Sequence, residues 1–194
     1  MRKLIFLTGL LILISLPAAA QTTPTLPRAE AFGGYNYIGT NSSNGDSSTY
    51  NGFKADVAIY PGSWFGLVAE VGRSTASSFK DSTGTRNVSS SSLIPYLFGP
   101  RFRFGTGRFT PFIDTLIGGV NRSNLVGSNG AILVGAQKSV GVYAGGGVDV
   151  KLNSYVGLRL VNVGLLSTWF SPGAGIHNSQ DDLSVSTGIV FRWD

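Results

Sequence analysis

Residues 50–60 read YNGFKADVAIY, and the pattern within them recurs along most of the chain. Apolar side chains occupy one parity of this stretch, as at Phe53 and Ile59, whereas Lys54 and Asp56 occupy the other. Because successive side chains of a β-strand point to opposite sides, this alternation predicts a strand with one apolar and one polar face. The stretch therefore predicts an amphipathic β-strand.

Similar runs follow one another, separated alternately by long Ser/Asn/Gly-rich segments and by tight turns such as residues 61–63 and 153–154. This rhythm predicts four hairpins, with the long connections at one end and the short ones at the other. It is typical of an all-β, eight-stranded antiparallel up-and-down transmembrane β-barrel. We expect strands at residues 30–40, 50–60, 64–75, 91–104, 109–121, 138–152, 155–170 and 182–193.

The amino-terminal residues have the composition of an export signal. Arg2 and Lys3 precede an apolar core at residues 4–16, which is too short to span a bilayer as a helix, and small residues follow at 18–20. We therefore expect a cleavable signal peptide at residues 1–20, a flexible leader at 21–29 and the barrel domain at 30–194.

Composition limits the remaining function classes. The 194 residues include 27 Gly and no Cys, and only 13% are charged. Without cysteine the exported chain has no disulfide. Its basic residues are scattered singly, so we expect no nucleic-acid partner.

Alternation defines two faces of each strand, and residue type indicates which face meets lipid. One face is rich in Val, Ile, Leu, Phe and Ala; the other combines Gly and Ser with single charges of both signs. An eight-stranded barrel has room inside only for packed side chains, and buried charges must pair. We therefore expect an internal, structural polar network of Lys54, Asp56, Glu70, Arg101, Arg103, Asp114, Asp149, Arg159 and Arg192.

Aromatic side chains near the strand ends suit the two girdles at the membrane surfaces. This set comprises Tyr60, Trp64, Phe104, Phe109, Tyr155, Trp169, Phe170 and Trp193.

Two segments depart from the simple apolar/polar alternation. Residues 160–166 are apolar on both faces, for which a β-bulge is one explanation, and residues 122–137 keep enough apolar character for the flanking strands to extend beyond the bilayer.

Five short motifs stand out along the chain. They are Phe32-Gly33-Gly34-Tyr35, Phe98-Gly99-Pro100-Arg101, Pro111-Phe112, Gly145-Gly146-Gly147-Val148-Asp149 and Gly188-Ile189-Val190-Phe191-Arg192-Trp193. Together they resemble small bacterial outer-membrane β-barrel proteins, the opacity-protein and OmpA-like transmembrane domains, over essentially the whole mature chain. In this family the final strand ends on an aromatic residue that the outer-membrane assembly machinery reads; here Asp194 follows Trp193.

Candidate catalytic and ligand sites are few. His177, the only histidine, lies in a segment with Ser171 and Ser179, and a hydroxyl needs such a base to become a nucleophile. A solvated loop histidine explains it more simply. Residues 145–147 resemble a phosphate-binding glycine run but lie within an alternating strand with no helix after them. We expect no catalytic residue, cofactor or metal ion.

These observations predict an integral protein of the bacterial outer membrane with a structural or surface-interaction role through four extracellular loops. Its expected partners are outer-membrane lipids, the assembly machinery acting on the carboxy-terminal strand, and an unknown extracellular ligand at the loops. The loops could instead be only a hydrophilic cover, and the charged interior could form a narrow ion path. Two other functions stay open: a lipid-modifying outer-membrane enzyme, and a soluble exported lipocalin-like carrier with its polar face outside.

Overall fold

The computed structural model describes residues 27–42, 47–81, 84–105, 107–123, 125–127, 132–134, 136–170 and 178–193. Across these ranges, no helix is long and apolar enough to cross a membrane. All regular structure in these described ranges is β-sheet. The strands are β1 (Ala29–Ser42), β2 (Ser47–Ile59), β3 (Phe65–Asp81), β4 (Gly84–Ser90), β5 (Ser92–Arg103), β6 (Phe109–Arg122), β7 (Leu125–Gly127), β8 (Ile132–Val134), β9 (Gln137–Lys151), β10 (Val156–Phe170) and β11 (Asn178–Trp193).

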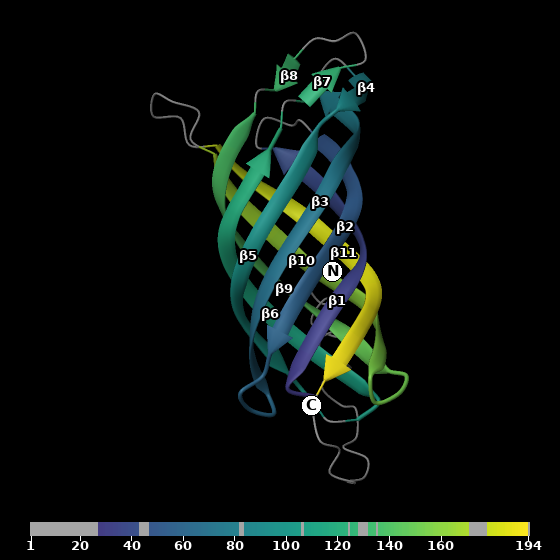
Figure 1. Cartoon of the computed structure of the whole chain (residues 1–194). Helices are drawn as coiled ribbons and strands as arrows, with labels where there is room; N and C mark the ends of the chain where they lie inside the picture. The colour runs from purple at the N-terminus through teal and green to yellow at the C-terminus, as the bar shows by residue number, and fades with distance from the viewer. Residues whose placement is uncertain are drawn as a thin grey trace, which may run out of the picture.

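Eight of these strands close into an antiparallel barrel, which confirms the predicted fold class (Figure 1). Around the barrel they follow the order β2-β1-β11-β10-β9-β6-β5-β3, and β3 pairs with β2 to complete the circle. Residues 60–64, 104–108 and 152–155 connect neighbouring strands at one end, which we call the turn end. The opposite end, which carries β4, β7 and β8, is the loop end.

The strands are strongly staggered. A path that follows hydrogen-bonded partners once around the barrel leaves β1 at Ser42 and returns to it at Phe32, ten residues away. A stagger of this size in eight strands requires a tilt of about 40° from the barrel axis. The intermediate partners are Gln180, Thr168, Gly141, Gly118, Leu97, Glu70 and Asp56.

The outer wall is apolar, as the alternation predicted. Phe98 on β5 is 64% exposed, and Ile113 and Ile117 on β6 are also exposed, whereas Asp114 between them is 2% exposed. The same division holds on the other barrel strands. Exposed apolar side chains elsewhere on the wall include Phe53, Val57, Leu67, Val71, Val140, Val163, Leu165, Leu183 and Ile189.

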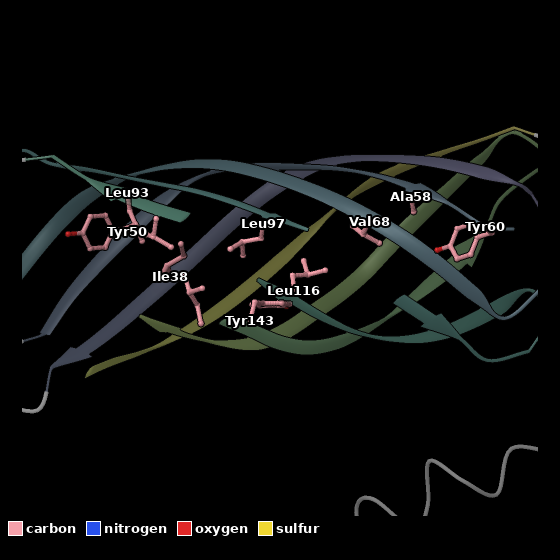
Figure 2. Close-up of a cluster of buried hydrophobic side chains, with 11 residues drawn as sticks. Ile38, Tyr50, Ala58, Tyr60, Val68, Leu93, Leu97, Leu116 and Tyr143 are labelled. Carbon is pink, nitrogen blue, oxygen red and sulfur yellow. The ribbon is translucent and has the colours of Figure 1, made fainter. Parts of the chain in front are cut away.

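The interior is less polar than the sequence suggested. The inner face was expected to hold Gly, Ser and charges, but it also contains a buried apolar cluster that follows the barrel axis (Figure 2). Tyr143 belongs to it, and its ring lies over Gly145 and Gly164, where an added Cβ would stand 2.4 Å from the ring or its hydroxyl. Glycines on the inner face therefore make room for large side chains. The cluster comprises Ile38, Tyr50, Ala58, Tyr60, Val68, Leu93, Leu97, Leu116, Val120, Tyr143 and Leu166.

A register shift interrupts β10, as the doubly apolar segment suggested. Pairing with β11 and β9 is irregular just after Arg159. Leu160 and Val161 both face outward, while Arg159 and Asn162 on either side are both buried. The Thr187 hydroxyl donates a hydrogen bond to the Arg159 carbonyl across this bulge, at 2.9 Å. Because lipid supplies no hydrogen-bond donor, the hydroxyl satisfies a carbonyl that the ladder has lost.

Two connections at the loop end contain strands that continue beyond the barrel. Residues 76–90 were expected to form a loop, but β3 extends to Asp81 and pairs with β4. β7 and β8 form a second small hairpin within residues 122–137, in line with strands extending beyond the bilayer. β4 also pairs with β7, so the two connections join into one sheet above the barrel (Figure 1). Backbone pairing outside the membrane needs no apolar face, so alternation could not indicate it.

An arginine in the middle of the outer wall tests which medium surrounds it. We expect Phe98→Arg to lower the free energy of unfolding in phospholipid vesicles by about 2–4 kcal/mol, since the charge would lie near the bilayer centre. Trp64→Arg is the control, because Trp64 is equally exposed but lies at the turn end, where arginine costs about 1 kcal/mol or less. Urea titration followed by tryptophan fluorescence measures both values. Equal losses for the two variants would contradict the assignment of the wall to lipid.

Removal of the Thr187 hydroxyl isolates its contribution to the bulge. Thr187→Val keeps the shape of the side chain but leaves the Arg159 carbonyl without this donor, so we expect a loss of about 1–2 kcal/mol in unfolding free energy. Thr115→Val serves as the matched control, since Thr115 is also an exposed threonine of the outer wall. A loss no larger than that of the control would show that the hydroxyl does not support the bulge.

Candidate functional site

All nine residues of the predicted polar network lie inside the barrel, and none is more than 6% exposed. They come from β2, β3, β5, β6, β9, β10 and β11. Most of them lie in the half of the barrel nearer the turn end, where β5 and β11 end at Arg103 and just after Arg192. Alternation in each strand is what turns these side chains to the same interior.

Asp56 is the centre of this network. Its carboxylate accepts hydrogen bonds from Arg101 at 3.1 and 3.3 Å and from Arg159 at 2.7 Å. Arg101 also donates to Asp114, at 2.7 and 3.1 Å, and Arg159 donates to Asp149, at 2.9 and 3.2 Å. We call these five residues the central ion-pair cluster. It joins five strands, since each member comes from a different one.

Two phenylalanines separate and cover the guanidinium groups of this cluster. The Phe112 ring lies 4.5 Å from Arg101 and 4.5 Å from Arg159, and the Phe32 ring lies 4.3 Å from Arg159. An aromatic face attracts a desolvated cation. The rings therefore stabilise two like charges that share one carboxylate, and they fill the space that water would otherwise take.

A second group closes the turn end. Glu30 accepts a hydrogen bond from Arg192 at 3.1 Å and one from the Tyr60 hydroxyl at 2.9 Å, and it lies 3.6 Å from Arg103. Arg103 stacks on the Tyr60 ring at 3.6 Å and donates to the Pro27 carbonyl at 3.0 Å. The predicted place of Tyr60 in the outer aromatic girdle was wrong, because the side chain is 3% exposed and has the inward parity of Asp56.

The sequence analysis also missed Glu30 as a member of the network. It stands at the start of its strand and has the same parity as Phe32, so alternation alone could have placed it inside. Glu30 brings the count to five acidic and five basic side chains. Lys54 and Glu70 complete the set, 3.0 Å apart, with Lys54 lying 4.8 Å from the Tyr143 ring.

Each of these ten side chains has an oppositely charged partner within 3.6 Å. Buried charges of both signs that neutralise one another cost less than isolated ones. The arrangement links strands and fills space; it presents no carboxylate free of a cation that could serve as a base. Within the described ranges, no group of three or more His, Cys, Asp and Glu could hold a metal ion.

The remaining sequence candidates lie elsewhere. Residues 145–147 lie within β9, between β6 and β10, rather than at a turn that could surround a phosphate. His177 and the segment around it lie outside the described residues, as do residues 1–20 and Asp194. The interior ion pairs are therefore the best-defined polar site of the described chain.

Comparison with known proteins extends these observations. The model of the outer membrane protein beta-barrel domain family matches residues 6–189. No curated protein is similar to the chain in sequence. Among solved structures, Neisserial surface protein A has a TM-score of 0.61 at 13% identity, with 85% of this chain and 97% of that chain covered.

Two further solved structures have the same fold. OprG from Pseudomonas aeruginosa has a TM-score of 0.58 at 11% identity, covering 87% of this chain and 96% of its own. Ail, the attachment invasion locus protein of Yersinia pestis, has a TM-score of 0.52 at 12% identity, covering 86% of this chain and all of its own. At such low identity these likenesses establish the fold alone.

Loss of the charge on Asp56 should leave two buried guanidinium groups with one carboxylate each. We expect Asp56→Asn to lower the free energy of unfolding by about 3–5 kcal/mol, since removal of one partner leaves buried charge uncompensated. Asp181→Asn is the control, because Asp181 is exposed on the outer wall, where its carboxylate accepts a hydrogen bond from the Ser167 hydroxyl. We expect Asp181→Asn to lower the free energy of unfolding by about 1 kcal/mol or less. Similar losses for both variants would show that Asp56 is not central to stability.

Proposed function

Because this chain belongs to the outer membrane protein beta-barrel family, we propose that it is a non-enzymatic outer-membrane barrel that acts through its loop end on partners outside the cell. The outer membrane follows from membership of the family. The observation that carries the proposal is the contrast between the two parts of the molecule: an interior filled with paired charges and apolar side chains, and a sheet that continues beyond the barrel at the loop end.

The filled interior favours a role that does not depend on transport through the barrel. Arg101 and Arg159 are at most 1% exposed and meet at Asp56 near the axis. Leu97, Leu116 and other members of the apolar cluster occupy the space nearer the loop end. Eight strands enclose only enough room for packed side chains. Function is therefore more readily assigned to the surface than to the lumen.

The loop end offers the surface that such a role needs. Pairing of β4 with β7 joins two connections into one sheet, supported by β3 from below. Binding residues commonly lie on loops that a rigid scaffold holds in place. The ordered part of the loop end therefore favours an interaction surface over a purely hydrophilic cover.

Export and insertion complete the proposal. Residues 1–20 would direct export and then be removed, and the carboxy-terminal strand, β11, would present Trp193 to the assembly machinery. The alternative of a soluble carrier is inconsistent with the apolar outer wall and the charged interior. The alternative of a lipid-modifying enzyme depends on His177, which lies outside the described residues.

Single cysteines can test the proposed orientation, because the chain has none of its own. We expect Ser123→Cys, at the loop end of β6, to react with a membrane-impermeant maleimide on intact cells. Ser154→Cys, in a turn-end connection, should react only after the outer membrane is permeabilised.

Replacement of residues 125–134 by a short Gly/Ser linker tests the surface role. It should reduce binding of the cells to immobilised matrix proteins or glycans, with the barrel still folded.

Planar-bilayer recordings supply a separate check on the interior. The purified protein should give no stable open-channel steps, since the ion pairs and apolar cluster occupy the lumen. Reversed cysteine labelling would contradict the orientation. Steady conductance through the purified protein would overturn the surface role. So would unchanged binding of cells that lack residues 125–134 to every immobilised matrix protein and glycan tested.

A further inference from the structure

A groove of about 320 Å³ lies near the loop end of β5, β6 and β9. Most of its lining residues have outward parity, so the groove opens on the outer wall and not on the lumen. Its volume is at the lower limit of small-molecule sites. The lining residues are Ser92, Ile94, Asn121, Arg122, Ser123, Ala136, Gln137 and Lys138.

Strand register places the groove where the outer wall changes from apolar to polar. Asn121 on β6 is paired with Ile94 on β5 and Lys138 on β9, so the three form one row across the wall. The next row toward the turn end consists of Tyr96, Gly119 and Val140 in the same order. Tyr96 and Val140 are exposed apolar residues of the wall. One step along the strands therefore separates the exposed apolar row of Tyr96 and Val140 from the row that brings Asn121 and Lys138 to the groove.

The Tyr96 ring helps to shape the wall below the groove. A Cβ added at Gly119 would stand 2.2 Å from the ring and its hydroxyl, so the ring lies across β6 where the strand has no side chain. This placement makes a flat apolar surface directly beneath Asn121. An acyl chain can lie along such a surface while the group attached to it enters the groove.

Two exposed cations flank the groove. Lys138 lines it, and Arg73 on β3 falls opposite Ile94 by the register of its neighbours, in which Ser74 pairs with Leu93 and Val71 pairs with Tyr96. Both side chains are exposed. Among the described residues neither has an ion-pair partner, in contrast to the ten paired charges of the interior.

The height of these cations suggests their partner. Arg and Lys near a membrane surface extend the charged group toward the headgroups while the stem stays with the apolar wall. Cations at this level attract the phosphates of anionic lipids, and charge-assisted hydrogen bonds to phosphate are among the stronger ones. The side-chain oxygen of Asn121, which has no hydrogen-bond partner among the described residues, suits a sugar hydroxyl rather than a second acyl chain. Beside it the Ser92 hydroxyl donates to the Ser123 hydroxyl at 3.3 Å, so this pair adds a second polar group at the groove.

We propose that this groove binds the headgroup of a phosphorylated glycolipid of the outer leaflet. Lys138 and Arg73 contact its phosphates, the polar side chains between them contact its sugar, and its acyl chains lie along Tyr96 and Val140. The site is separate from the loop-end surface proposed for extracellular partners, but its place in the outer leaflet rests on the orientation proposed above, in which the loop end faces the outside of the cell. It gives the lipid a fixed place beside β5, β6 and β9.

Native mass spectrometry of the folded protein in detergent can test the site. The probes are bisphosphorylated lipid A, its monophosphorylated form and dioleoylphosphatidylglycerol. We expect bisphosphorylated lipid A to bind most tightly. Lys138→Gln and Arg73→Gln should each weaken it about fivefold, which corresponds to about 1 kcal/mol per cation near a membrane surface. Lys151→Gln, on the same strand as Lys138 but at the turn end, should leave the affinity unchanged.

A second variant tests the groove without altering charge. Ile94→Trp should fill it and weaken the bisphosphorylated lipid by at least fivefold, while gel mobility before and after heating reports that the barrel is folded. Equal affinity in the wild type, Lys138→Gln and Arg73→Gln would overturn the proposal. It would also be overturned if dioleoylphosphatidylglycerol bound as tightly as lipid A, since the site would then not recognise a sugar-bearing headgroup.

Discussion

Mutual neutralisation of charges inside the barrel is the constraint on which the rest of the structure depends. The wall faces an apolar medium, so every ionised group on the inner face must find its counter-charge within a narrow lumen. Asp56 meets this requirement for two arginines at once, and Phe112 stacks between them. The arrangement favours one geometry, because a shift of one residue in any of the five contributing strands would turn its charged side chain to the lipid.

The shape of the barrel wall also allows the charged and aromatic side chains to pack inside it. The ten-residue stagger inclines the strands, and glycines on the inner face leave space for Tyr143 and the rings that cover the guanidiniums. The bulge in β10 has a related effect. By placing Leu160 and Val161 consecutively on the outside, it keeps Arg159 directed at Asp149 and Asn162 at Tyr143, to whose hydroxyl Asn162 is hydrogen-bonded at 2.8 Å.

Alternation in the sequence predicted the eight strands and the inward direction of all nine charged residues, because a period of two is a local property. Alternation was not a sufficient guide to the apolar interior, to the strands beyond the barrel or to the groove. Tyr60 was assigned to the girdle by residue type although its parity points inward. The apolar part of the interior was not predicted, although the parity of Leu97 and Leu116 also points inward. β4, β7 and β8 carry no alternation to reveal them. The groove at Lys138 depends on three strands in register, which no single segment indicates.

The long sequence separation of the central contacts constrains how the protein is assembled. Asp56 and Arg159 are 103 residues apart, and Glu30 and Arg192 are 162 residues apart. Single hairpins pair only part of this charge, as Arg101 does with Asp114 and Arg159 with Asp149. Asp56 and Glu30 meet their arginines only when distant strands come together, so a partly inserted intermediate would carry unpaired ions into hydrocarbon. Insertion should consequently be a concerted event in which the last strands arrive before the first ones are stable. The buried carboxylates would make the finished barrel much more stable than any of its fragments.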